Sequence, residues 1–200
     1  MLELMALRWI LASASPRRRL LLEMAGVRPE VWQGAPDENL PEDTPAASWG
    51  LMAARKKAEW FRSKRPSGSV LVTADTTVVL DNEVLNKPHD AEDAFHMLQR
   101  LNGRTHQVMT GVCVLTDAGE MAFVETTEVT FRQLPEAFLR AYAQSGQGLD
   151  KAGSYGAQDA FGILGIQAIQ GCFYNVMGLP VSRIFFELGQ LFKSSLSITK

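Results

Sequence analysis

The sequence predicts an α/β protein with a mixed central sheet flanked by helices. Short apolar, β-branched segments of strand length intermix along the chain with segments whose apolar residues recur at helical spacing. Two long strand-like segments are joined by a turn of the kind that links antiparallel neighbours, so the sheet is not purely parallel. The 200 residues, 46% of them hydrophobic, can bury a substantial core, and we expect a single domain over residues 1–200.

The first part of the chain is expected to form a strand, a tight turn and a helix. The apolar run 9–12 stops at small polar residues and is typical of a buried strand. Pro16 then opens a helix that Gly26 ends, with an apolar face formed by Leu20, Leu21, Met24 and Ala25. An extended segment at 30–33 leads into an acidic loop at 34–43.

The next predicted elements are a helix and a strand that ends at Asp75. Thr44 followed by proline is the pattern of an N-cap and first helical position, and this helix is expected to end at Pro66. Residues 69–74 are apolar and β-branched, which predicts a central strand with Asp75 at its C-terminal end. A hairpin is expected around residues 81–82.

A capped helix and a pair of long strands are expected in the middle of the chain. Asp90 can cap a helix that Asn102-Gly103 closes, with an apolar stripe formed by Ala94, Met97, Leu98 and Leu101. Strands are expected at 106–116 and 121–131, joined by the turn 117–119.

The C-terminal third is expected to be mainly helical around a glycine-rich stretch. A helix is predicted over 135–144, and the stretch 146–178 shows few periodicities. The last helix is expected over 180–192, with inward-facing Ile184, Phe185 and Leu188. Residues 193–200 are expected to form a frayed tail.

Composition and charge narrow the classes of partner. The net charge of −2, from 20 Lys and Arg against 22 Asp and Glu, gives no overall positive field, so we expect no nucleic-acid partner. No apolar stretch reaches the ~20 residues of a membrane span, and Glu3 and Arg8 argue against an N-terminal signal segment. Cys113 and Cys172 lack the spacing of a zinc site or a disulfide framework, which indicates the reducing cytoplasm.

The turn Ser13-Ala14-Ser15-Pro16-Arg17-Arg18 is a candidate anion site. A turn between a strand and a helix presents unpaired backbone N–H groups and the positive end of the helix dipole. Arginines at 17–19 oppose that dipole, at roughly 0.3–1 kcal/mol each when exposed, and a bound anion would offset the repulsion. The alternative is that these arginines are solvated or paired with the acidic loop 37–43.

Five further charged positions are candidates for phosphate or metal chemistry. Asp75 follows an apolar strand, where open α/β sheets bind ligands, and a carboxylate there can hold a divalent cation or activate water. Its alternative is a turn cap. Asp37 and Glu38 form a candidate magnesium pair in what is otherwise a solvated acidic loop. On position alone, Lys57 lies on a solvated helix face and Lys87 is a surface-turn lysine.

Six ordered motifs carry a resemblance to a known family. They are Leu11-Ala12-Ser13-Ala14-Ser15-Pro16-Arg17-Arg18, Ala74-Asp75-Thr76, Asn86-Lys87-Pro88, Asn102-Gly103-Arg104-Thr105-His106, Asp150-Lys151-Ala152-Gly153-Ser154-Tyr155-Gly156-Ala157-Gln158 and Asn175-Val176-Met177-Gly178-Leu179-Pro180. In this order the chain closely resembles the Maf family of nucleoside triphosphate pyrophosphatases. The resemblance implies a cytoplasmic homodimer that hydrolyses nucleoside triphosphates to the monophosphate and pyrophosphate. It also implies an elongated, two-lobed fold related to the inosine triphosphate pyrophosphatases, with a cleft between the lobes.

The resemblance also implies roles for individual residues. By position, Asp75 matches the family's proton acceptor. Three residues fall on the positions that separate the family's specificity groups, and they are Arg17, Thr76 and Gln158. This combination is similar to that of the group acting on dTTP and UTP. The positions that line the phosphates are Ser13, Arg18, Lys57 and Lys87. The implied cofactor is a divalent metal cation, Mg or Mn, held by Glu38 and Asp75.

Three alternatives remain open from the sequence. They are the same chemistry on 7-methyl-GTP or non-standard purine triphosphates, a non-catalytic nucleotide-binding regulator of cell division, and a generic phosphate-binding module. The chain also departs from the family pattern at Asn86 and Asp159, where Gly is usual or frequent, and the segment 159–165 needs a one-residue length adjustment.

Overall fold

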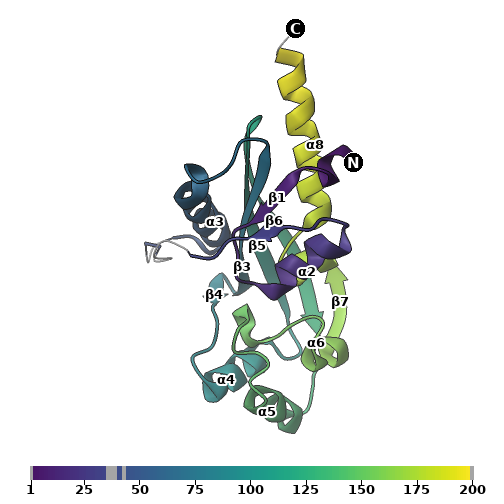
Figure 1. Ribbon diagram of the computed structural model, residues 1–200. Helices are drawn as coiled ribbons and strands as arrows, with labels where there is room; N and C mark the ends of the chain where they lie inside the picture. Colours follow the sequence, from purple (N-terminus) through teal and green to yellow (C-terminus); the bar gives the residue numbers. More distant parts are fainter. Residues whose placement is uncertain (1, 35–39, 42–43, 199–200) are drawn as a thin grey trace. The chain divides into compact units, whose positions relative to one another are not determined.

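The mixed α/β architecture is confirmed by the computed structural model, which describes residues 2–34, 40–41 and 44–198 (Figure 1). Within those residues the sheet has seven strands in the order β2-β1-β3-β5-β6-β7, with β4 paired to β3. Strand β1 is parallel to β2 and β3, whereas β4 and β7 are antiparallel to their neighbours. The strands are β1 Arg8–Leu11, β2 Glu30–Val31, β3 Ser69–Leu80, β4 Glu83–Leu85, β5 Thr105–Thr116, β6 Gly119–Phe131 and β7 Ile166–Gln170.

Local sequence signals begin several of the helices. Ser15 caps α2 with proline at its first position, and Asp90 Oδ1 accepts hydrogen bonds from Glu92 N and Asp93 N, both at 2.9 Å, at the start of α4. The helices are α1 Leu2–Met5, α2 Pro16–Met24, α3 Ala46–Arg62, α4 Ala91–Leu101, α5 Glu136–Gln144, α6 Ala160–Gly165, α7 Phe173–Val176 and α8 Val181–Ile198, with a 3-10 turn at Ala152–Ser154. None of the described helices is long and apolar enough to span a bilayer.

The chain divides into two compact units. Unit 1 comprises Met1–Asp75, Thr110–Glu125 and Gly178–Lys200. Its core joins α3 to β1, β3 and β5, and its buried members are Ile10, Ala12, Ala54, Ala58, Phe61, Leu71, Cys113 and Leu115. Helix α8 packs on β1 in this unit, because the rings of Trp9 and Phe185 stack with centroids 5.1 Å apart.

Unit 2 comprises Thr76–Met109 and Thr126–Met177, and its core combines aliphatic side chains with a cluster of aromatic rings. The ring of Phe131 packs edge-on against those of Tyr155 and Phe161, at centroid distances of 4.8 and 5.0 Å. Helices α4 and α5 lie side by side, and the Arg140 guanidinium stacks 3.9 Å from the centroid of the Phe95 ring.

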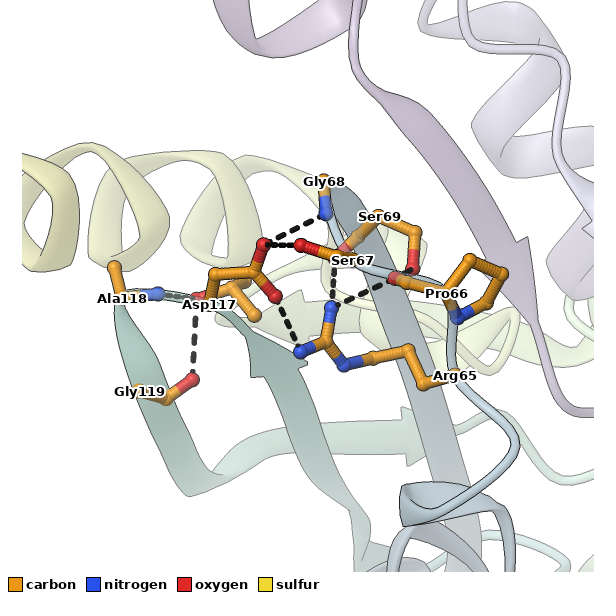
Figure 2. Close-up of polar contacts among 9 residues, drawn as sticks. Arg65, Pro66, Ser67, Gly68, Ser69, Asp117, Ala118 and Gly119 are labelled. Carbon is orange, nitrogen blue, oxygen red and sulfur yellow. Dashed lines mark hydrogen bonds and ion pairs between the residues drawn. The ribbon is translucent and has the colours of Figure 1, made fainter.

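One carboxylate joins two loops of unit 1. Figure 2 shows Asp117, in the β5–β6 turn, accepting hydrogen bonds from Ser67 Oγ and Gly68 N at 2.7 Å and from Arg65 Nη2 at 2.6 Å. The bond from Ser67, followed by those from Arg65 and Gly68, lowers the pKa of Asp117 to about 2. The loop that leads into β3 is therefore fixed to the β5–β6 turn.

The structure corrects two expectations about strands. Asp75 does not end its strand, because the β-branched run Thr76-Thr77-Val78-Val79 continues β3 to Leu80. The glycine-rich stretch contains an unpredicted strand, β7, whose mostly exposed side chains give no alternating apolar pattern. The hairpin at 81–82 is confirmed, with positive φ angles of 53° and 64° at Asp81 and Asn82.

Three details of the helices also differ from expectation. Pro45 is the N-cap of α3, in place of Thr44. The buried face of α2 is formed by Leu21 and Leu22, whereas Leu20 and Met24 are exposed. Helix α8 continues to Ile198, six residues beyond its expected end, because no glycine or proline interrupts that segment.

Candidate active site

The turn between β1 and α2 has the geometry of an anion site. Ser13 Oγ accepts a hydrogen bond from Ser15 N at 3.2 Å, and Ser15 Oγ accepts one from Arg18 N at 3.5 Å. These contacts fix the backbone at the N-terminus of the nine-residue helix α2. Arg17 lies half-buried in the first turn of that helix. The positive end of the helix dipole therefore lies beside a cationic side chain, which favours an anionic ligand.

Arg18 connects this turn to two distant segments of unit 1. Its Nη1 donates to Ser13 Oγ at 3.1 Å and to Ala74 O at 2.8 Å, and its Nε donates to Gly178 O at 2.9 Å. Charge-assisted bonds to three different segments restrain the guanidinium and hold the turn next to the residue that precedes Asp75. Arg18 thus has a structural task that sequence reasoning missed, and its contact with phosphate stays a prediction.

Asp75 forms an ion pair with Lys57. The distance from Lys57 Nζ to Asp75 Oδ1 is 3.2 Å, and the two side chains are only 11% and 23% exposed. Thr73 Oγ1 donates to Ala54 O at 2.7 Å, so α3 is anchored to β3 one helical turn before Lys57 and two residues before Asp75. Lys57 is therefore not on a solvated helix face, and the site has a cation next to its carboxylate.

Two glycines allow α3 to approach the strands this closely. A Cβ atom added to Gly50 would lie 2.9 Å from Asp75 O, and one added to Gly111 would lie 2.1 Å from Leu51 N. Both distances are shorter than the contacts that Cβ atoms make in real proteins, so a side chain at either position would push the two backbones apart. The available signal in the sequence was a glycine inside a helix and another inside a strand, which often mark a close backbone approach.

Two of the candidate residues of unit 2, Lys87 and Gln158, lie on segments that are joined by a hydrogen bond, whereas Thr76 lies in β3. Gly153 N donates to Asn86 O at 3.2 Å, so the segment that carries Lys87 is tied to the segment that leads to Gln158. Lys87 is exposed and Thr76 is half-buried. Gln158 Oε1 is buried, and no residue in the described part of the chain donates a hydrogen bond to it. A buried acceptor without a donor is uncommon and indicates that a ligand or water completes it.

The expected metal ligands are only partly covered by the structure. Glu38 lies outside the described residues, whereas Asp75 is described. Among the described residues, no group of three or more His, Cys, Asp or Glu side chains could hold a metal ion. Magnesium is commonly held by one or two carboxylates together with phosphate oxygens and water. A single carboxylate beside an anion site therefore fits a cation that arrives with a phosphorylated ligand.

A helix N-terminus, a half-buried lysine–carboxylate pair and a mixed sheet define an α/β protein equipped for phosphorylated ligands. The chain belongs to the Maf-like protein family, whose model matches residues 8–191. This match covers every residue proposed for the site.

Similar proteins with curated names share substantial identity with this chain. A dTTP/UTP pyrophosphatase from Phocaeicola vulgatus is 43% identical over 184 residues, which cover 91% of this chain and 95% of the relative. One from Porphyromonas gingivalis strain W83 is 44% identical over 185 residues, covering 90% and 92% of the two chains.

A solved structure also matches, at lower similarity. It is a nucleoside-triphosphatase / dITP/XTP pyrophosphatase from Mycobacterium abscessus, with 17% identity and a TM-score of 0.42, covering 96% of this chain and 100% of that one. Likeness at that level supports no argument about fold or activity. The relation to the inosine triphosphate pyrophosphatases therefore stays a prediction.

Proposed function

We propose that this protein is a nucleoside triphosphate pyrophosphatase that hydrolyses dTTP and UTP to the monophosphate and pyrophosphate. The observation that carries the proposal is the Lys57–Asp75 pair in the same unit as the β1–α2 anion turn. The named relatives support the choice of reaction and of pyrimidine nucleotides, since they are called dTTP/UTP pyrophosphatases and cover about nine-tenths of the chain.

In the proposed reaction, Asp75 accepts a proton from the attacking water. The water oxygen forms a bond to the α-phosphorus, the bond from that phosphorus to the bridging oxygen breaks, and pyrophosphate leaves with the bond electrons. Lys57 Nζ lies 3.2 Å from Asp75 Oδ1 and stabilises that carboxylate before the substrate binds. Once the triphosphate is bound, its oxygens provide Lys57 with a second anionic partner. Such transfers depend on positioning and charge stabilisation, so no covalent nucleophile is required.

The phosphates would be held by cationic and hydroxyl groups. Arg17 and the N-terminus of α2 would bind phosphate oxygens, helped by Ser13, Arg18, Lys57 and Lys87. Asp75 and Glu38 would hold the divalent cation, Mg or Mn. When bound, this ion would neutralise phosphate charge and polarise a phosphoryl oxygen.

Base recognition is proposed for Arg17, Thr76 and Gln158. The buried Gln158 Oε1 offers an acceptor, which suits the N3–H donor of uracil and thymine. Cytosine presents an acceptor at that position and would leave the Gln158 oxygen without a donor. We further propose, from the family resemblance, that the enzyme acts in the cytoplasm as a homodimer.

A nucleotide panel tests the function. Pyrophosphate release is measured with dTTP, UTP, dCTP, 7-methyl-GTP and dITP in the presence of Mg, Mn or a chelator. We expect fastest turnover of dTTP and UTP, and loss of activity with the chelator. Preference for 7-methyl-GTP or dITP would overturn the base assignment. Nucleotide-dependent thermal stabilisation without any monophosphate product would instead favour the non-catalytic regulator.

A matched pair of variants tests the role of Asp75. Asp75→Asn should lower kcat for dTTP by about 100-fold or more, because general-base assistance contributes about 10²–10⁴-fold. Asp81→Asn is the control, since Asp81 lies in the exposed β3–β4 hairpin and pairs with Arg104. Full turnover by Asp75→Asn would contradict the assignment.

A further inference from the structure

The residue after Gln158 carries a polar network that the proposed chemistry does not use. Asp159 Oδ2 accepts a hydrogen bond from Tyr142 Oη at 3.1 Å and lies 3.2 Å from Lys151 Nζ. The side chains of Asp159 and Lys151 are only 17% and 12% exposed. A carboxylate so far removed from water is held in place by these partners, since leaving it unpaired would be costly.

Both partners of Asp159 are themselves fixed. Lys151 Nζ also donates to Gln147 O and to Asp150 Oδ1, the latter at 2.7 Å. Tyr142 is buried in α5, and burial together with the neighbouring Asp159 charge raises the pKa of its hydroxyl. The hydroxyl therefore remains a donor at neutral pH. Asp159 is thus fastened to a helix and to a loop within unit 2.

Gly156 connects this network to Gln158. A Cβ atom added to Gly156 would lie 2.6 Å from Asp159 Oδ2 and 2.9 Å from Gln158 Nε2. The carboxylate and the amide therefore occupy neighbouring positions over the same glycine. The fixed Asp159 carboxylate therefore adjoins the Gln158 amide, whose oxygen is buried without a donor in the described residues.

We propose that Asp159, held by Tyr142 and Lys151, is a positioning residue that orients the Gln158 amide for a pyrimidine base. The inference rests on the proposed function and adds the residues that set its selectivity. An amide held in one orientation presents an acceptor, whereas a freely rotating amide can present either its oxygen or its nitrogen. Fixing the orientation before binding also lowers the entropy cost of binding. Loss of the network should therefore weaken discrimination between N3–H bases and cytosine.

The test compares kinetic constants for dTTP and dCTP in Asp159→Asn, Asp159→Glu and Tyr142→Phe. In Asp159→Asn and Tyr142→Phe we expect KM for dTTP to rise and the dTTP-to-dCTP ratio of kcat/KM to fall, each by about tenfold, the size of one lost hydrogen bond to a charged group. The kcat for dTTP should change less than about twofold, because the reacting phosphates are not involved. Asp159→Glu keeps the charge and should retain most of the selectivity.

Matched controls separate positioning from general destabilisation. Tyr174→Phe and Asp81→Asn make the same chemical changes at exposed positions and should leave the selectivity ratio unchanged. Unfolding temperatures are measured for every variant. Should Asp159→Asn fail to fold, the test rests on Tyr142→Phe, which should lose selectivity, compared with Asp159→Glu, which should retain most of it.

The outcomes distinguish the two proposals. Suppose that wild type is active and that folded Asp159→Asn and Tyr142→Phe keep its dTTP-to-dCTP ratio of kcat/KM. This result would overturn the positioning role of Asp159 and leave the pyrophosphatase proposal standing. A fall in kcat with unchanged KM and ratio would also overturn it. A wild-type protein that releases no pyrophosphate from any nucleotide would refute both.

Discussion

Acidification should destabilise the protein through His106, a buried residue of β5. Its side chain is 2% exposed, its Nε2 lies 2.7 Å from Tyr155 Oη, and its ring lies 5.1 Å from that of Phe131. Within the described residues, Nδ1 has no hydrogen-bond partner. Burial lowers the pKa of His106 from 6.5 to about 4, because the charged imidazolium would lose its hydration in this apolar surrounding.

The sign and size follow from proton linkage. The unfolded chain binds a proton at His106 near pH 6.5, whereas the folded protein binds it only near pH 4. The contribution of this group to stability is complete above pH 6.5 and is lost as the pH falls toward 4. At about 1.4 kcal/mol per pKa unit, the full loss is about 3 kcal/mol, and about 2 kcal/mol is lost by pH 5.

Urea unfolding at pH 7.5 and pH 5 measures this loss of stability, and a pair of histidine variants shows whether His106 causes it. His106→Gln should be less stable than wild type at pH 7.5 but should lose about 2 kcal/mol less on acidification. His96→Gln is the control, because that imidazole is 63% exposed on α4. Equal losses of stability in wild type and His106→Gln between the two pH values would refute the reasoning.

Three further substitutions test packing and the site. Gly111→Ala should lower the free energy of unfolding, measured by urea titration, by about 1–3 kcal/mol, because its methyl group would meet the α3 backbone. Gly189→Ala is the control: its added atom would lie 3.9 Å from Leu4, so this variant should unfold no more easily than wild type in the same titration. Asn175→Ala should lower the free energy of unfolding by about 2–3 kcal/mol, since the fully buried Asn175 donates from Nδ2 to Val108 O and Thr127 Oγ1, both at 3.0 Å. An unchanged urea midpoint would show that these bonds contribute little. Lys57→Met should lower kcat for dTTP by about 100-fold while the protein stays folded by circular dichroism. Wild-type turnover in that variant would remove Lys57 from the proposed mechanism.

Features determined by neighbouring residues could be predicted from the sequence. The Asp90 cap of α4, the proline at the start of α2 and the hairpin at 81–82 all follow from local hydrogen bonding and backbone preference. The motif order also identified the family, which the family match confirms. The cap, the proline and the hairpin are each contained within a short stretch of chain, whereas the family is identified by short motifs in a fixed order along it.

Features that depend on tertiary contacts could not be predicted in the same way. On sequence position alone, Lys57 is predicted to lie on a solvated helix face, because its partner, Asp75, lies on a separate strand. Their pairing requires the close approach of α3 at Gly50 and Gly111, which no periodicity encodes. Likewise, the Asp159 network joins α5, a loop and the start of α6, and in the sequence Asp159 was visible only as a departure from the family pattern.

Strand register explains why separate motifs form one part of the site. Leu11 pairs with Val72 in the parallel ladder between β1 and β3, so Ser13 and Ala74 each lie two residues beyond the same pair. Arg18 bonds both of them. A shift of one residue in that register would place Asp75 on the opposite face of β3, away from Lys57. By bonding both residues, Arg18 supports the observed register and so contributes to the geometry of the site even before any phosphate binds.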